Sequence, residues 1–341
     1  MSYRYQLNAK CQEFVTRYLG QSLITPEDPR MIQVNRRLLA LAFKHPFLMH
    51  ASLAVAFAYD RHLNSSSSSG SRRSVEECYH WSQSTTLFNR RLRQPVGTGD
   101  KDPVWGTAGA LAILSFCSPD ACTPEESWPL KPSDEPSDGL EWLRMSRGKM
   151  SLWAVANPLR PDSLYSILAP VFADMDSRPP EGGTHGIPGA LAAVCRLEDS
   201  STAGNNAYFS AAHALSQLQH LPDSQVTVGQ TELLPRSIHG SFELLLREKD
   251  PVALLLLYLW YRKAGRCIWW VGLRARVECP AICSYLRLHH KGYGAVQAFL
   301  PGGSLADGWT CLDSPILEGS SFPDMPTDVT ATMRVGIPGD E

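Results

Sequence analysis

Histidine and cysteine pairs are the side chains whose types and spacing come nearest to a reactive site. His45 and His50 flank a Pro-Phe-Leu-Met segment, but a spacing of five does not place two side chains on one helix face. Each is interpreted as a helix cap or a buried histidine rather than a general base. Cys279 and Cys283 are four residues apart and do share a face. Since no histidine pattern accompanies them, structural thiols are a better interpretation than metal ligands.

Sequence signatures of established catalytic centres are absent. The chain contains no Gly-x-Ser-x-Gly elbow, no Walker loop and no His-Glu-x-x-His motif. We therefore predict no metal and no cofactor, and the sequence assigns no catalytic residue.

Aromatic residues are the more suggestive feature, because five of them crowd into residues 258–270. They either pack a core or line an apolar cavity, where Tyr and Trp supply rigid walls with polar tips. Such walls suit flat hydrophobic ligands such as sterols, terpenoids or polyketides. The candidate ligand-binding residues of such a cavity are Phe47, His50, Phe57, Tyr258, Tyr261, Trp269 and Trp270. Among them, His50 and Tyr261 are the candidate polar contacts.

The elements that must position these side chains are predicted to be helices. Residues 47–59 are apolar nearly all round, as in a helix buried on most sides. Asp250-Pro251 is a strong helix start, predicting a helix to about Tyr261 and another over 267–288. Asp162 is a predicted N-cap for a helix reaching about Phe172. A further amphipathic stripe is formed by Met31, Val34, Leu38 and Leu41.

Few segments alternate with the period of a strand, and residues 226–228 are the only short β-like run. We therefore predict an all-α fold, built as a single large multi-helix array. Residues 118–139 carry too many prolines for a packed element and are predicted to form a long surface loop. The predicted organisation is a helical regulatory or ligand-binding-like domain over residues 1–300 and an irregular C-terminal tail over 301–341.

Composition excludes several classes of protein. Of the 341 residues, 43% are hydrophobic and 19% are charged, which argues against disorder of the whole chain. The net charge of −2 leaves no basic surplus for phosphates, so no direct nucleic-acid binding is expected. The nine scattered cysteines include no Cys-x-x-Cys, which argues against a zinc cluster and a disulfide framework. Without a signal peptide or a membrane-spanning run, we expect a nuclear or cytoplasmic protein that is neither secreted nor membrane-bound.

Three parts of the sequence together resemble a known family. They are the segment from His45 to Phe57, the stretch Trp142-Leu143 with Gly148, and the order from Phe242 through Asp250-Pro-Val-Ala-Leu and Trp269-Trp270-Val-Gly-Leu-Arg to Ile282 and Leu286. This order is similar to the regulatory domain of fungal-specific transcription factors, such as the sterol uptake control proteins, over about residues 5–300. The resemblance implies an all-helical domain that binds an apolar ligand and regulates transcription in a fungus.

The sequence departs from that family in two respects. Family members usually carry an upstream binuclear cluster of six zinc-binding cysteines, which the cysteines of this chain cannot form. Tyr258 and Leu259 stand where relatives often have a small and a polar residue. A different pocket and the absence of direct DNA binding are therefore expected.

Three functional hypotheses follow. The first is a regulator that senses an apolar small molecule and controls a metabolic or secondary-metabolite pathway without its own zinc cluster. It would act through a DNA-binding transcription factor or as a homo-oligomer. The second is a repurposed enzyme of secondary-metabolite biosynthesis, which catalyses cyclisation or cycloaddition of a terpenoid or polyketide intermediate; such a reaction needs mainly orientation and a shielded cavity. The third is a non-functional paralogue or a fragment of a longer gene product.

Overall fold

The N-terminal amphipathic stripe forms helix α2 (Pro29–Ala42), which begins where the Asp28 side chain accepts a hydrogen bond from the backbone N–H of Arg30. The computed structural model describes residue 11 and residues 28–64, 72–119, 121–131 and 139–304. Met31 and Val34 are buried, whereas Leu38 and Leu41 are partly buried in the same cluster. The predicted stripe is therefore the packed face of this helix.

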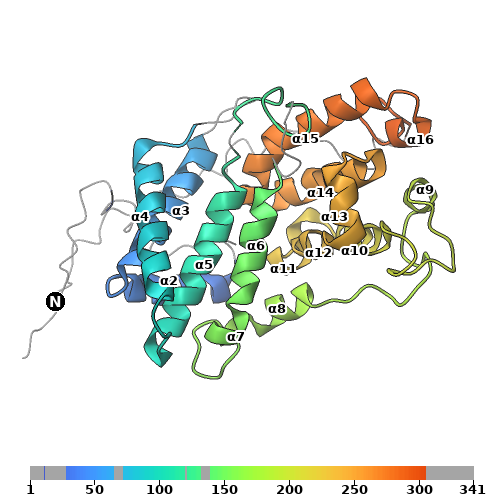
Figure 1. Cartoon of the computed structure of the whole chain (residues 1–341). Coiled ribbons are helices and arrows are strands. Elements are labelled where there is room, and N and C mark those ends of the chain that lie inside the picture. The colour runs from blue at the N-terminus through green and yellow to red at the C-terminus, as the bar shows by residue number, and fades with distance from the viewer. Residues whose placement is uncertain (1–10, 12–27, 65–71, 120, 132–138, 305–341) are drawn as a thin grey trace, which may run out of the picture. The chain divides into compact units, whose positions relative to one another are not determined.

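Helix α3 (Pro46–Asn64) is buried on most of its surface, as its uniform apolar sequence predicts. It packs against α2, against α4 (Val75–Leu92) and against α5 (Lys101–Phe116) (Figure 1). Ser74 caps α4 by accepting from the backbone N–H of Glu77. The first part of the fold is thus a group of helices around α3.

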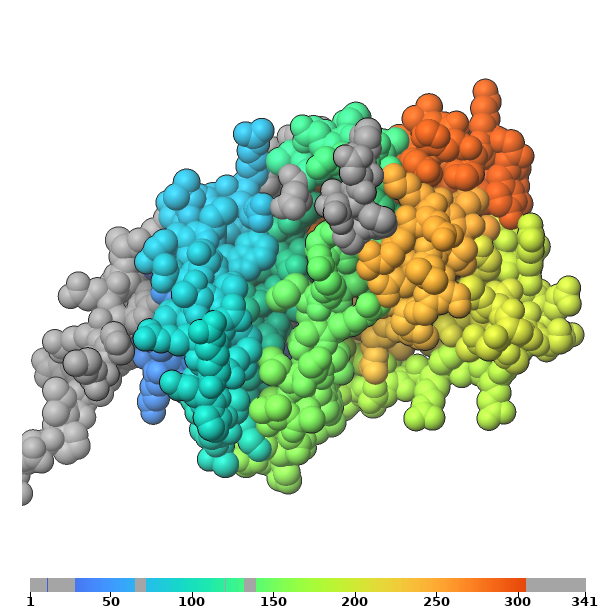
Figure 2. All heavy atoms as spheres, in the orientation of Figure 1, coloured from blue at the N-terminus to red at the C-terminus, as the bar shows by residue number. Residues whose placement is uncertain are grey.

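Shorter helices follow in the middle of the chain. They are α6 (Glu141–Ser151), α7 (Trp153–Ala156), α8 (Ala169–Met175), α9 (Gly189–Val194), α10 (Phe209–Gln219), α11 (Val228–Thr231), α12 (Leu233–Ser237) and α13 (Gly240–Arg247), with 3₁₀ turns at Thr98–Asp100 (η1), Ser166–Leu168 (η2) and Asp223–Gln225 (η3). Figure 2 shows α6 in green beside the golden α13 segment. There, Arg147 donates to Glu243 at 2.5 Å and to the carbonyl oxygen of Ile238 at 2.6 Å. These bonds tie α6 to α13 and to the end of α12.

The two longest C-terminal helices are α14 (Pro251–Cys267) and α15 (Trp269–His289), and α16 (Gly294–Gln297) follows them. The predicted start of α14 is confirmed, since Asp250 Oδ1 accepts from the N–H groups of Val252 (3.0 Å) and Ala253 (2.9 Å). The helix continues beyond Tyr261 to Cys267 because its last turns are buried as well. A Cβ on Gly272 would lie 2.7 Å from the carbonyl oxygen of Gly265, so glycine allows the two helices to approach closely.

The all-α prediction is confirmed, because the residues that the structure describes form helices, turns and loops and no strand. The β-like run at 226–228 lies at the start of α11, where Thr227 and Gln230 form a capping box. Residues 121–131 form turns and no helix, as their prolines predict, but the predicted surface position is wrong for Ser127, Trp128 and Pro129, which are buried. Within the described ranges, no helix is both long and apolar enough to cross a membrane.

By internal contacts the chain divides into two units, Met1–Cys311 and Leu312–Glu341. The second unit, and with it most of the predicted tail at 301–341, lies outside the described residues.

Candidate functional site

The seven residues predicted to line a ligand cavity are all buried, and they fall into two groups. The first group, on α3, consists of Phe47, His50 and Phe57. The second consists of Tyr258 and Tyr261 on α14 with Trp269 and Trp270 at the start of α15. The rings of Tyr59 and Trp269, with centroids 5.2 Å apart, join α3 to α15.

The first group faces helix α4. Phe47 packs on Phe88 with ring centroids 5.9 Å apart, and Phe57 stacks on His80 at 5.8 Å. His50 Nδ1 lies 2.7 Å from His80 Nδ1. Burial, followed by the nearby His80, lowers the pKa of His50 to about 4, and burial also lowers the pKa of His80. The structure thus makes His50 one half of a neutral, hydrogen-bonded histidine pair.

This pair predicts a specific response to acid. The native state keeps His50 neutral where the unfolded chain binds a proton, so the free energy of unfolding falls as the pH drops from 6.5 towards about 4. When the pH is lowered from about 7 to about 4.5, the free energy of unfolding should fall in both proteins. We expect the decrease in His50→Asn to be about 1–3 kcal/mol smaller than in the unmodified chain. Urea unfolding at the two pH values measures this difference. Equal losses in both proteins would contradict it.

The second group contains a buried polar network. The Tyr261 hydroxyl donates to Glu278 Oε2 at 2.6 Å, and Arg274 pairs with the same carboxylate. Arg274 Nε also donates to the carbonyl oxygen of Phe116 at 2.6 Å. Burial raises the pKa of Glu278, and the Arg274 guanidinium opposes that shift. A tyrosine hydroxyl has one proton, and that of Tyr261 is donated to Glu278. The hydroxyl predicted to contact a ligand therefore donates its hydrogen bond to another buried side chain.

The other members of the second group pack on neighbouring side chains. The Arg262 guanidinium lies 5.5 Å from the centre of the Tyr258 ring, in a cation–π arrangement. Trp269 and Trp270 meet edge to face at 5.6 Å. Trp269 and Trp270 therefore contact each other, whereas Tyr258 and Tyr261 contact Arg262 and Glu278.

Sequence reasoning missed another aromatic group, which we call the Trp105 cluster: Trp105 on α5, Trp153 on α7, Tyr165 before η2, and Phe172 on α8. Its ring centroids lie 5.3 Å (Trp105–Trp153), 5.1 Å (Trp153–Phe172) and 6.3 Å (Trp105–Phe172) apart. Trp105 and Tyr165 are buried, whereas Trp153 and Phe172 are partly exposed. The cluster therefore presents aromatic surface at one partly open edge.

The Tyr165 hydroxyl is buried within this cluster and has no hydrogen-bond partner in the part of the chain that the structure describes. It lies beside Gly106 of α5, where an added Cβ would collide with it and would come within 2.7 Å of the partly buried Leu38. Burial, reinforced by the charge of Asp102, raises the pKa of Tyr165 well above its usual value, so the phenol stays neutral. A buried donor without an acceptor costs about 1–3 kcal/mol, and a bound acceptor would recover that cost.

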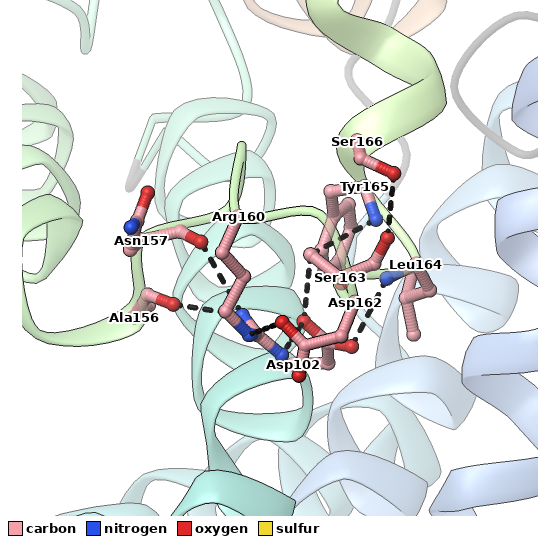
Figure 3. A network of polar contacts seen from close by, with 9 residues as sticks. All are labelled: Asp102, Ala156, Asn157, Arg160, Asp162, Ser163, Leu164, Tyr165 and Ser166. Carbon is pink, nitrogen blue, oxygen red and sulfur yellow. Dashed lines mark hydrogen bonds and ion pairs between the residues drawn. The ribbon is translucent and has the colours of Figure 1, made fainter.

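A polar network holds Tyr165 in this position (Figure 3). Asp102, in the first turn of α5, accepts from Arg160 Nη2 at 2.7 Å, from Ser163 Oγ at 2.8 Å and from the Leu164 N–H at 3.1 Å. Ser163 Oγ in turn accepts from the Tyr165 N–H at 3.1 Å. Three hydrogen bonds to Asp102 thus fix residues 160–164 on the start of α5, and the fourth orders Tyr165 within the segment.

The prediction that Asp162 caps a helix reaching Phe172 is wrong. Asp162 is exposed and pairs with Arg160, while α8 begins only at Ala169, after η2. Asp102 replaces it as the anchor because its carboxylate lies close to three donors from 160–164. Local sequence around residue 162 carries no signal of that long-range contact.

Among the positions that the structure describes, no three or more His, Cys, Asp or Glu side chains are grouped so that they could hold a metal ion. In comparisons with known proteins, no family model, no curated protein and no solved structure matches this chain.

Proposed function

We propose that this chain is a regulatory protein that senses an apolar small molecule at the Trp105 cluster. The observation that carries the proposal is the buried Tyr165 hydroxyl, a neutral donor in an apolar cluster that has no acceptor among the described residues. Buried polar groups normally have partners, so an unpaired one in an apolar site is suited to an oxygen atom of a ligand.

The cluster favours a flat ligand with one acceptor, such as a sterol, terpenoid or polyketide. The rings of Trp105, Trp153 and Phe172 offer edges and faces to a hydrocarbon skeleton. At the rim, the Lys149 ammonium lies 5.9 Å from the centre of the Trp105 ring, where it would attract a ligand's polar end.

The regulatory role rests on the resemblance to the fungal-specific transcription factor domain, which the all-helical architecture supports. In this proposal the chain acts in the nucleus through a DNA-binding transcription factor or as a homo-oligomer, and controls a metabolic or secondary-metabolite pathway. Chromatin recruitment of a tagged chain, lost when its DNA-binding partner is deleted, is the expected result. Unchanged transcripts of every biosynthetic pathway after deletion of the gene would contradict the proposal.

The Tyr165 hydroxyl also favours a second candidate, an enzyme of secondary-metabolite biosynthesis. A hydrogen bond to a ligand carbonyl would withdraw electrons from a conjugated alkene, and the aromatic walls would hold the reacting carbons in place. Cyclisation or cycloaddition of a terpenoid or polyketide intermediate needs little more than these two effects. Conversion of such an intermediate above its spontaneous rate by the unmodified chain, and loss of that conversion in Tyr165→Phe, distinguishes an enzyme from a sensor.

Tyr165→Phe tests the ligand site by moving two quantities in opposite directions. Without ligand, removal of an unpaired buried hydroxyl is expected to raise the free energy of unfolding by about 1–2 kcal/mol. The affinity for a small molecule that accepts its proton is expected to fall about tenfold. Urea unfolding and ligand titration measure the two effects. A less stable Tyr165→Phe protein would mean that the fold itself satisfies the hydroxyl.

A further inference from the structure

A second group of reactive side chains lies between α3 and α4, away from the Trp105 cluster. His80 Nε2 is 3.4 Å from Cys11 Sγ, and His80 Nδ1 is 2.7 Å from His50 Nδ1. All three side chains are buried. We call them the Cys11 array. A thiol, an imidazole and a third group that orients the imidazole are the parts of an activated cysteine nucleophile.

The two distances restrict the proton positions. One histidine of the pair must donate through Nδ1 and the other must accept. When His80 donates to His50, its Nε2 carries a lone pair and accepts the Cys11 S–H. In this tautomer His80 is the base for the thiol, and His50 holds the ring in the orientation that the transfer requires.

We propose that Cys11 is a nucleophilic thiol that adds to electron-poor alkenes and forms a thioether with them. The proposal is independent of the ligand site at Tyr165. It names a class of small electrophiles, the α,β-unsaturated carbonyl compounds, as covalent ligands of the Cys11 array.

The reaction is balanced by the groups present. His80 Nε2 takes the thiol proton as the sulfur attacks the β-carbon of the alkene. The C–S bond forms while the carbon–carbon π electrons move to the α-carbon, and His80 returns the proton there. One S–H bond and one π bond are exchanged for one C–S and one C–H bond, without an oxidant or a leaving group.

The surroundings of the array suit a flat apolar reagent. Phe57 stacks on the His80 ring with a 19° interplanar angle, and Phe47 lies on the same helix. Tyr79 packs edge-on against both histidine rings, at 5.2 Å from His80 and 5.9 Å from His50, and is 55% exposed. The imidazoles therefore lie directly beneath a surface residue.

Other buried thiols of the chain provide the contrast. Cys117 bonds to the Leu114 carbonyl oxygen and Ser118, and burial raises its pKa to about 11. Burial raises the pKa of Cys195 to about 12. Such thiols hold their protons and are poor nucleophiles, so they serve as internal references for Cys11.

The test is labelling of the native full chain with N-ethylmaleimide, itself an electron-poor alkene, followed by peptide mass mapping of each cysteine. A Cys78→Ser background removes one exposed thiol. Cys11 is expected to label about 10- to 100-fold faster than Cys117 and Cys195, and His80→Asn is expected to abolish that advantage. The matched control is His213→Asn, which alters a buried histidine whose Nε2 lies 3.1 Å from the carbonyl oxygen of Gly183. It should leave the labelling ratio unchanged.

The ratio of Cys11 to Cys195 labelling also reports folding, because both thiols label quickly in an unfolded chain. If His80→Asn exposes Cys195, His50→Asn takes its place, and a smaller decrease of the Cys11 rate is expected. Labelling of Cys11 no faster than Cys195 in the native chain would overturn the proposal. The proposal would also be overturned if the variant that keeps Cys195 protected, His80→Asn or His50→Asn, showed the same ratio of Cys11 to Cys195 labelling as the unmodified chain.

Discussion

Glu278→Gln is expected to destabilise the protein by about 3–5 kcal/mol, one of the largest effects available to a single substitution in this chain. Glu278 and Arg274 are buried together, with side chains 2% and 6% exposed. Removing the carboxylate charge leaves the Arg274 guanidinium buried and uncompensated. Urea unfolding measures the loss as a lower midpoint at constant slope.

The cost should come from the unpaired charge rather than from lost packing. A variant that replaces the whole network by apolar groups, Arg274→Met with Glu278→Met and Tyr261→Phe, is therefore expected to lie closer in stability to the original protein than Glu278→Gln does. A loss below about 1 kcal/mol in Glu278→Gln would show that water reaches Arg274 and that the network is not a buried ion pair.

Asp102→Ala is expected to have the second large effect, a loss of about 2–4 kcal/mol. The carboxylate accepts three hydrogen bonds from the segment that carries Tyr165, and its charge pairs with Arg160, whose side chain is 11% exposed. Without it, Arg160 Nη2, Ser163 Oγ and the Leu164 N–H lose the acceptor that Asp102 provides, and the segment loses these three bonds to α5. Ligand retention should therefore fall together with the unfolding midpoint.

Asp162→Ala is the matched control for Asp102→Ala. Asp162 pairs with the same arginine, at 3.2 Å from Arg160 Nε, but its side chain is 74% exposed. An exposed pair contributes little, so the expected change in stability is within about 0.5 kcal/mol. Equal losses in the two variants would contradict the assignment of Asp102 as the anchor.

The elements that the sequence predicts well are those whose signals are local. The stripe from Met31 to Leu41 and the Asp250-Pro251 start each place a helix correctly, because helical periodicity and capping depend on residues a few positions apart. The buried character of α3 follows from its uniform apolar sequence in the same way.

The Trp105 cluster illustrates what local patterns cannot show. Its four aromatic residues come from four different parts of the chain, and each taken alone is typical of core packing. The anchor between Asp102 and Leu164 spans 62 positions, and the pair of His50 and His80 spans 30. Such contacts depend on how helices pack, for which neither motif nor spacing gives a signal.

The predicted wall residues show a related limit. The aromatic density at 258–270 correctly indicates burial. It does not show that the proton of Tyr261 is committed to Glu278, which lies on the following helix. Burial and availability for a ligand are different properties, and only the second depends on hydrogen-bond partners from other elements.

Native mass spectrometry of the chain purified from a fungal host tests the central claim, a small molecule held by Tyr165, most directly. The unmodified chain is expected to retain an apolar molecule that organic solvent extracts. Tyr165→Phe is expected to retain about tenfold less at limiting ligand, whereas Tyr285→Phe, which alters a partly exposed tyrosine of α15, should retain as much as the unmodified chain. Equal occupancy in all three proteins, or no retained molecule in any, would contradict the account.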